Sequence, residues 1–163
     1  MPYAARVAAA MLVLAALAFG ALCLSQLWRD NAAPDIDPRA YPAAREGRYA
    51  LAVDRCDRTA KKLTVQGWLV LPGQPREARR LRVAVAQNGR WRALDTRLHD
   101  RDDVAGRAAA DTSVAGYYRH SGFEASVDLA RAGIVGPIEA VAVAHDSSAG
   151  AALVALPCPG LVP

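Results

Sequence analysis

The sequence lacks the common signatures of an enzyme. Neither the Gly-x-Ser-x-Gly segment of a nucleophile elbow nor a phosphate-binding glycine loop occurs in its 163 residues. The histidines His99, His120 and His145 lie far apart, and none forms an i, i+4 metal pair. His145, Asp146 and Ser147 have the residue types of a hydrolase triad, but neighbours in one turn do not generally reach the required geometry. We therefore expect a non-enzymatic protein without a metal or other cofactor.

Lysine is also scarce, and arginine carries almost all of the positive charge. The net charge is +4, and the pair at 61–62 contains the only lysines. The densest basic stretch contains Arg76, Arg79, Arg80 and Arg82. One interpretation is contact with anionic lipid headgroups or acidic polysaccharide. The alternative, which we favour, is a solvated loop of an arginine-rich protein.

One long apolar run, residues 7–28, follows Arg6 and contains no charge. About 20 helical residues cover the ~30 Å hydrocarbon core of a bilayer. Small residues at 16–20 would suit a signal-peptide cleavage site, but the uncharged run continues to Trp28, a residue type found at membrane interfaces. Cys23 is not preceded by a lipobox. The sequence therefore favours an uncleaved anchor over a cleaved signal.

Two opposing sequence signals bear on which side of the membrane the folded domain lies. Arg29, Arg39 and Arg45 follow the run, so the positive-inside rule taken literally would place the following domain in the cytoplasm. Long domains, however, cross largely regardless of charge. Cys56 and Cys158 bracket the folded region, which predicts a disulfide in an oxidising compartment, with two unrelated buried thiols as the alternative. We expect a single-pass protein of the bacterial inner membrane with a periplasmic domain, without nucleic acid as a partner.

The rest of the chain divides into a linker and a β domain. Residues 29–47 contain three evenly spaced prolines and predict a semi-extended spacer. Alternating apolar residues then predict about seven strands, and Asn88-Gly89 predicts a type I′ hairpin turn. The expected architecture is an N-terminal transmembrane helix or signal at 1–28, the linker, and an all-β, immunoglobulin-like two-sheet sandwich at 48–163. The predicted strands are 49–53, 63–70, 81–87, 91–98, 123–129, 138–144 and 151–156.

A charged segment and an aromatic segment interrupt the strands. Asp100-Arg101-Asp102-Asp103 would suit ion pairing, which we favour over a calcium site, and residues 102–110 would suit one or two helical turns. In the segment Tyr117, Tyr118, Arg119 and His120, aromatic rings would stack on sugars while the other two side chains donate hydrogen bonds. The alternative places one tyrosine inside the sandwich and the other on its surface.

Three short motifs occur in a fixed order: Gly67-Trp68 within a strand, the segment 101–105 (Arg-Asp-Asp-Val-Ala), and Ser121-Gly122-Phe123 at the start of a strand. This pattern over residues 48–156 resembles a β-sandwich module attached to bacterial glycosyltransferases and other cell-surface polysaccharide enzymes. The motif residues are expected to have structural roles. Trp68 and Phe123 would fill the core, Arg101 and Asp103 would pair with each other or with backbone, and Gly122 would adopt a conformation closed to residues with a Cβ.

The resemblance implies a non-enzymatic accessory or binding module in envelope polysaccharide synthesis or modification. Its expected partners are the inner-membrane bilayer, a protein of the cell envelope, and polysaccharide. The alternative function is a structural subunit of a secretion, pilus or division assembly, since such subunits often combine one span, a short proline spacer and a small β domain.

Overall fold

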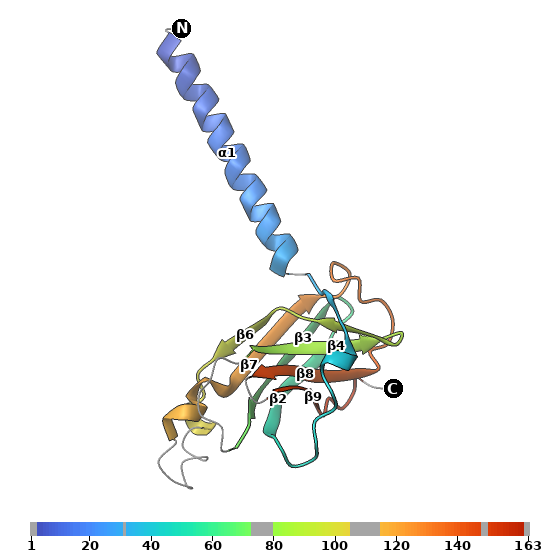
Figure 1. Cartoon of the computed structure of the whole chain (residues 1–163). Helices are drawn as coiled ribbons and strands as arrows, with labels where there is room; N and C mark the ends of the chain where they lie inside the picture. Colours follow the sequence, from blue (N-terminus) through green and yellow to red (C-terminus); the bar gives the residue numbers. More distant parts are fainter. Residues whose placement is uncertain (1–2, 31, 73–79, 105–114, 148–149, 162–163) are drawn as a thin grey trace.

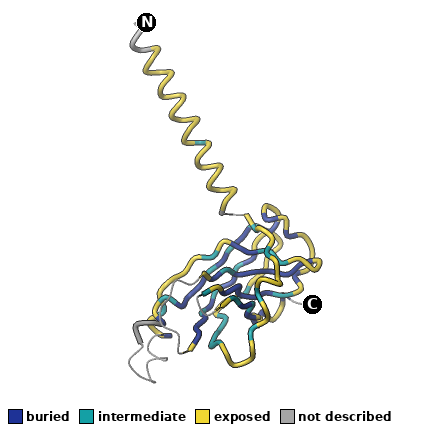
Figure 2. Tube along the Cα trace, in the orientation of Figure 1, coloured by how far each residue is buried: buried dark blue, intermediate teal, exposed yellow. Residues whose placement is uncertain are grey.

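The computed structural model describes residues 3–30, 32–72, 80–104, 115–147 and 150–161. A long N-terminal helix, α1 (Tyr3–Asp30), leads into a β-sandwich (Figure 1). Along its described length α1 is exposed almost throughout, whereas the sandwich encloses a buried interior (Figure 2). The stretch Arg6–Arg29 is long and apolar enough to cross a membrane, by length and composition.

The sandwich consists of two antiparallel sheets, which confirms the predicted all-β architecture with its N-terminal helix. Sheet A has the order β1-β5-β4-β8-β9 and sheet B the order β2-β3-β7-β6. In the part of the chain that the structure describes, the 3-10 helices η1 and η3 lie between strands. The strands of sheet A are β1 (Asp35–Ile36), β5 (Arg90–Ala93), β4 (Arg80–Gln87), β8 (Ala140–Ser147) and β9 (Gly150–Ala155). Sheet B comprises β2 (Ala50–Arg58), β3 (Lys62–Val70), β7 (Gly122–Asp128) and β6 (Thr96–His99), and the 3-10 helices are η1 (Pro38–Ala40) and η3 (Ala115–Ser121).

The predicted strand 91–98 is in fact two strands on different sheets. β4 and β5 form the expected hairpin, with φ of 51° at Asn88 and 69° at Gly89. The chain then leaves sheet A at Leu94, whose N–H donates to the carbonyl of Val83 at 2.7 Å, and continues as β6 in sheet B. Alternation alone does not reveal this change of sheet, because the period of two continues across it.

The core lies between the sheets and is closed by the disulfide. Leu63, Val65 and Phe123 of sheet B are fully buried, and they belong to one cluster with the inward-facing residues of sheet A. Cys56 on β2 bonds to Cys158, with 5.6 Å between their Cα atoms and a sequence separation of 102. The disulfide therefore joins sheet B to the segment that follows the last strand of sheet A.

The linker does not remain a free spacer. Asp35–Ile36 pairs with β5 at one edge of sheet A, and Ala44 donates to the carbonyl of Leu153 on β9 at 2.9 Å. Residues 34–44, which we call the strap, therefore run from one edge of sheet A to the other. Between these points the Tyr41 hydroxyl accepts a hydrogen bond from Arg82 on β4 at 3.1 Å. The proline-rich segment is thus held against sheet A by contacts with β5, β4 and β9.

Small side chains on the outer face of sheet A accompany the strap. Alanines at 84, 86, 142 and 144 are all buried, although they alternate with the valines that face the core. Arg82 shares their face by the same alternation, and it is the residue that Tyr41 contacts. The strap therefore crosses a face of methyl groups, which allows close approach of a second segment.

Candidate functional site

The three motifs that carry the resemblance meet at one end of the sandwich. In the β3–β7 pair, Gly67 lies opposite Phe123 and Trp68 opposite Gly122. Arg101 follows β6, and its Cγ would lie 2.8 Å from a Cβ added at Gly122. Segments up to 55 residues apart (67 to 122) therefore form one contact cluster, which we call the motif end. Figure 1 shows η3 at this end, away from the base of α1.

The two motif glycines are needed for space. A Cβ at Gly67 would collide with the carbonyl oxygen of Ala52 and lie 3.0 Å from the Phe123 ring. A Cβ at Gly122 would lie 2.5 Å from Nε2 of His99. Neither glycine is among the positive-φ residues. The expectation that Gly122 adopts a conformation closed to other residues is therefore wrong, and close packing against its neighbours is the reason for glycine.

The two motif aromatics lie on opposite faces of sheet B. Phe123 is 0 % exposed and belongs to the core, as expected. Trp68 does not fill that core, because it alternates with the inward-facing Leu69 along β3. It is half-buried on the other face and packs against a small cluster formed by Val70, Val104 and Tyr118.

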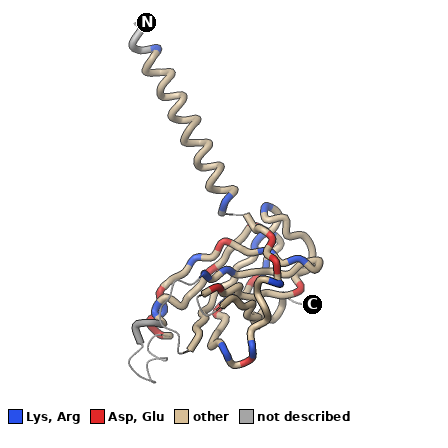
Figure 3. Tube along the Cα trace, viewed as in Figure 1, with Lys and Arg blue, Asp and Glu red and all other residues tan. Residues whose placement is uncertain are grey.

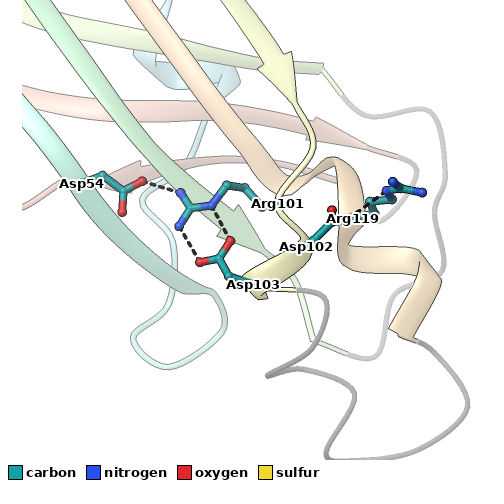
Figure 4. A network of polar contacts seen from close by, with 5 residues as sticks. All are labelled: Asp54, Arg101, Asp102, Asp103 and Arg119. Carbon is teal, nitrogen blue, oxygen red and sulfur yellow. Dashed lines mark hydrogen bonds and ion pairs between the residues drawn. The ribbon is translucent and has the colours of Figure 1, made fainter.

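Arg101 holds two carboxylates at the motif end (Figure 4). Its Nε and Nη2 donate to the two oxygens of Asp103, each at 2.8 Å, and its Nη1 donates to Asp54. The pair with Asp103 was expected. Asp54 was not, because it is the extra residue of a β-bulge between Val53 and Arg55, and nothing in the sequence marked the bulge.

The ion pairs of Arg101 shift the pKa values of both Arg101 and Asp103. The hydrogen bond to Arg101 lowers the pKa of Asp103 from 3.8 to about 2. Hydrogen bonds to Asp103 and Asp54 raise the pKa of Arg101 above its ordinary value. The Arg101 side chain is only 18 % exposed, and the two aspartates supply the opposite charge that its guanidinium needs in this partly buried position.

The structure places the described residues of the predicted aromatic contact segment in different environments. Tyr118 is 7 % exposed and packs in the small cluster beside Trp68, so its ring does not present a face to a sugar. The side chain of Tyr117 lies outside the described residues. Arg119 is 57 % exposed and forms ion pairs with Asp100 and Asp102, both at 3.1 Å, while His120 contacts Asp100.

The carboxylates at 100–103 therefore take part in ion pairs rather than standing free. Asp100 and Asp102 pair with Arg119, and Asp103 pairs with Arg101. Figure 3 shows acidic and basic residues interspersed along the chain here. Within the described ranges, no group of three or more His, Cys, Asp or Glu side chains is placed to hold a metal ion. The helical turn expected at 102–110 is seen at 102–104, and its remainder lies outside the described residues.

His145 is buried on strand β8 and does not lie in the turn that the sequence predicts after this strand. It is 2 % exposed, and its Nδ1 is 3.3 Å from the hydroxyl of Tyr49, with the two rings edge to face. Burial raises the pKa of Tyr49. Asp146 and Ser147 continue the same strand, β8, so the turn expected there is wrong. Ser147 donates its hydroxyl to the carbonyl of Gly150 at 3.3 Å.

The basic stretch is described only in its second half. Arg80 is exposed at the start of β4, and Arg82 contacts the strap. Arg76 and Arg79 lie outside the described residues.

Comparison with known protein families, with curated proteins and with solved structures finds no match for this chain.

Proposed function

We propose that this protein is a membrane-anchored, non-enzymatic accessory module of the bacterial cell envelope. Its β-sandwich would lie in the periplasm and act in the synthesis or modification of envelope polysaccharide. The observation that carries the proposal is the meeting of the Gly67-Trp68, Arg101–Asp103 and Gly122-Phe123 segments in one contact cluster. Such a meeting is expected if the motifs belong together as a module rather than occurring by chance.

The anchored state is supported by the surface of α1. Its large apolar side chains are exposed, from Val7 at 43 % to Trp28 at 75 %. A continuous apolar surface of this length requires a nonpolar environment, which a bilayer supplies. Arg29 in the last turn would then lie at the membrane surface.

The periplasmic location is supported by the disulfide. Cys56 and Cys158 lie at bonding distance within the folded domain, and such bonds persist in oxidising compartments. The free cysteine, Cys23, lies in α1 and takes no part in this bond.

A protein partner fits the motif end better than a sugar. The burial of Tyr118 removes one of the two rings that would have stacked on a sugar. What this end exposes instead is charge of both signs, with Arg119 and Asp102 more than half exposed. Mixed charge gives specificity in contacts between proteins.

The test is affinity purification of the full-length protein from detergent-solubilised native membranes, followed by mass spectrometry. We expect a polysaccharide enzyme or polymer-export component to co-purify with the wild type. Arg119→Ala should reduce its recovery, whereas Arg45→Ala, which changes an exposed arginine outside the motif end, should not. Thermal melting of both variants shows that the loss does not come from unfolding.

Two results would overturn the proposal. Recovery of secretion, pilus or division components in place of polysaccharide enzymes would assign the protein to a structural assembly. Equal recovery of a polysaccharide component with the wild type and with Arg119→Ala would show that the motif end does not contact that component.

A further inference from the structure

A groove borders the edge of the sandwich nearest to α1. β4 contains eight residues, but β5 pairs only with its last four, from Ala84 to Gln87. The chain then crosses to sheet B and forms β6, which is an edge strand. The groove has a volume of about 520 Å³ and is lined by residues of both exposed strand edges, 80–82 on β4 and Thr96 and Leu98 on β6, with Arg29 and Ala32 beside them.

The backbone of β4 directs hydrogen-bonding groups into this groove. Val83 is the last residue satisfied on this side, because its carbonyl accepts from Leu94 at 2.7 Å and its N–H donates to Oγ1 of Thr96 at 2.8 Å. Residues two apart in an antiparallel strand point their backbone groups to the same edge. The N–H and C=O of Leu81 therefore face the groove, and no described residue bonds to them.

An inward-facing apolar side chain is left uncovered beside these groups. Leu98 lies opposite Phe123 in the β6–β7 pair, so both side chains are on the inner face of sheet B. Phe123, on the inner strand β7, is 0 % exposed, whereas Leu98, on the edge strand β6, is 43 % exposed. An apolar side chain on an added strand would cover Leu98.

The residues that line the groove carry an excess of positive charge. Arg29, Arg80 and Arg82 line it, against one acidic residue, Asp95. Arg29 is in the last turn of α1, so this side of the groove opens where α1 leaves the membrane. A segment that enters from the membrane surface would meet three positive charges, which favours an acidic chain.

We propose that the groove binds an extended, acidic segment of a partner membrane protein, just outside the bilayer, by strand addition to β4. The backbone of Leu81 would pair with the segment, an apolar side chain would cover Leu98, and carboxylates would lie beside Arg29 and Arg80. None of the motif residues 67, 68, 101, 103, 122 and 123 lines this groove, and the inference does not depend on a role with polysaccharide.

The test uses the full-length protein in phosphatidylcholine nanodiscs and fluorescein-labelled ten-residue peptides. One peptide alternates glutamate and valine, and its control alternates lysine and valine. We expect the anisotropy to rise with the glutamate peptide only. Arg80→Gln and Leu98→Ser should each weaken binding about tenfold, whereas Arg97→Gln, on the opposite face of β6, should not.

Hydrogen exchange distinguishes strand addition from simple charge attraction. The amide of Leu81 should exchange rapidly in the free protein and slowly with the glutamate peptide. Failure of that peptide to bind, equal binding of both peptides, or binding without protection of Leu81 would overturn the proposal. Protection of Leu81 by phosphatidylglycerol nanodiscs without peptide would assign the groove to lipid headgroups and overturn it as well.

Discussion

At the residue scale, Arg101 joins segments that are distant in the sequence. Its guanidinium contacts Asp54 on β2 and Asp103 in the crossover, and its stem packs beside Gly122 at the start of β7. The bidentate geometry with Asp103 requires a planar fork of donors, which lysine does not have. The motif therefore requires arginine at this position for the geometry of its hydrogen bonds as well as for its charge.

The pKa of Asp103 makes stability depend on pH in acid. Arg101 lowers this pKa from 3.8 to about 2, so the carboxylate contributes stability that is complete above pH 3.8 and is lost as the pH falls to about 2. We expect Asp103→Asn to lower the free energy of unfolding at neutral pH and to flatten its decrease between these two values. Urea unfolding of both proteins from pH 2 to 7 measures the difference, and parallel curves would contradict the prediction.

Truncation of the two motif aromatics to alanine should lower the free energy of unfolding by different amounts. Phe123→Ala should lower the free energy of unfolding by about 3–5 kcal/mol, because it leaves a cavity in the core. Trp68→Ala should cost less, because Trp68 is half-buried on the opposite face of sheet B. Chemical denaturation of the two variants tests the order, and a larger loss for Trp68→Ala would refute the placement of the two rings.

At the element scale, the strap and the alanine face of sheet A depend on each other. Tyr41 and Ala44 of the strap contact Arg82 and Leu153 of the sheet, across a face where alanines are buried. Alanine is a poor strand former, so its frequency here is not explained by local preference. It is explained by a second segment that needs to approach the sheet closely.

Enlarging one of these alanines should displace the strap. Ala142→Leu should lower the free energy of unfolding by about 1–3 kcal/mol, since the added atoms have no space. Limited proteolysis should then cut within residues 34–44 faster than in the wild type. Ala155→Leu, at an exposed position of β9, is the matched control and should leave both measurements unchanged. Unaltered cleavage in Ala142→Leu would show that the strap does not rest on this face.

At the scale of the whole molecule, one covalent bond closes the domain. The disulfide Cys56–Cys158 encloses nearly all of the sandwich in a single loop. Helix α1 lies outside that loop, and the strap lies outside it as well. Reduction therefore acts on the domain and leaves its covalent attachment to α1 unchanged.

Reduction of the disulfide should destabilise the domain measurably. Closing a loop of 102 residues contributes roughly 4–5 kcal/mol in the chain-entropy model. A reductant should therefore lower the melting temperature of the full-length protein. Cys56→Ser should have a similarly lowered melting temperature and no further response to reductant, while Cys23→Ser should behave as the wild type. An unchanged wild-type transition with reductant would contradict the bond's contribution.

The sequence by itself determined the features that depend on neighbouring residues. Strand alternation, the Asn88-Gly89 turn, the long apolar helix and the burial of Phe123 are all visible in short windows, because each depends on local backbone geometry or on a period of two or 3.6. The pairing of Cys56 with Cys158 was also accessible, since these are the two cysteines of the folded region.

Only the tertiary structure decided which face each residue occupies and which distant segments meet. Alternation has the same period on both faces of a strand, so it did not show that Trp68 points away from the core. The bulge at Asp54, the change of sheet after Leu94 and the path of the strap likewise depend on partners far away in the chain. Their physical cause is packing between sheets, which no local pattern encodes.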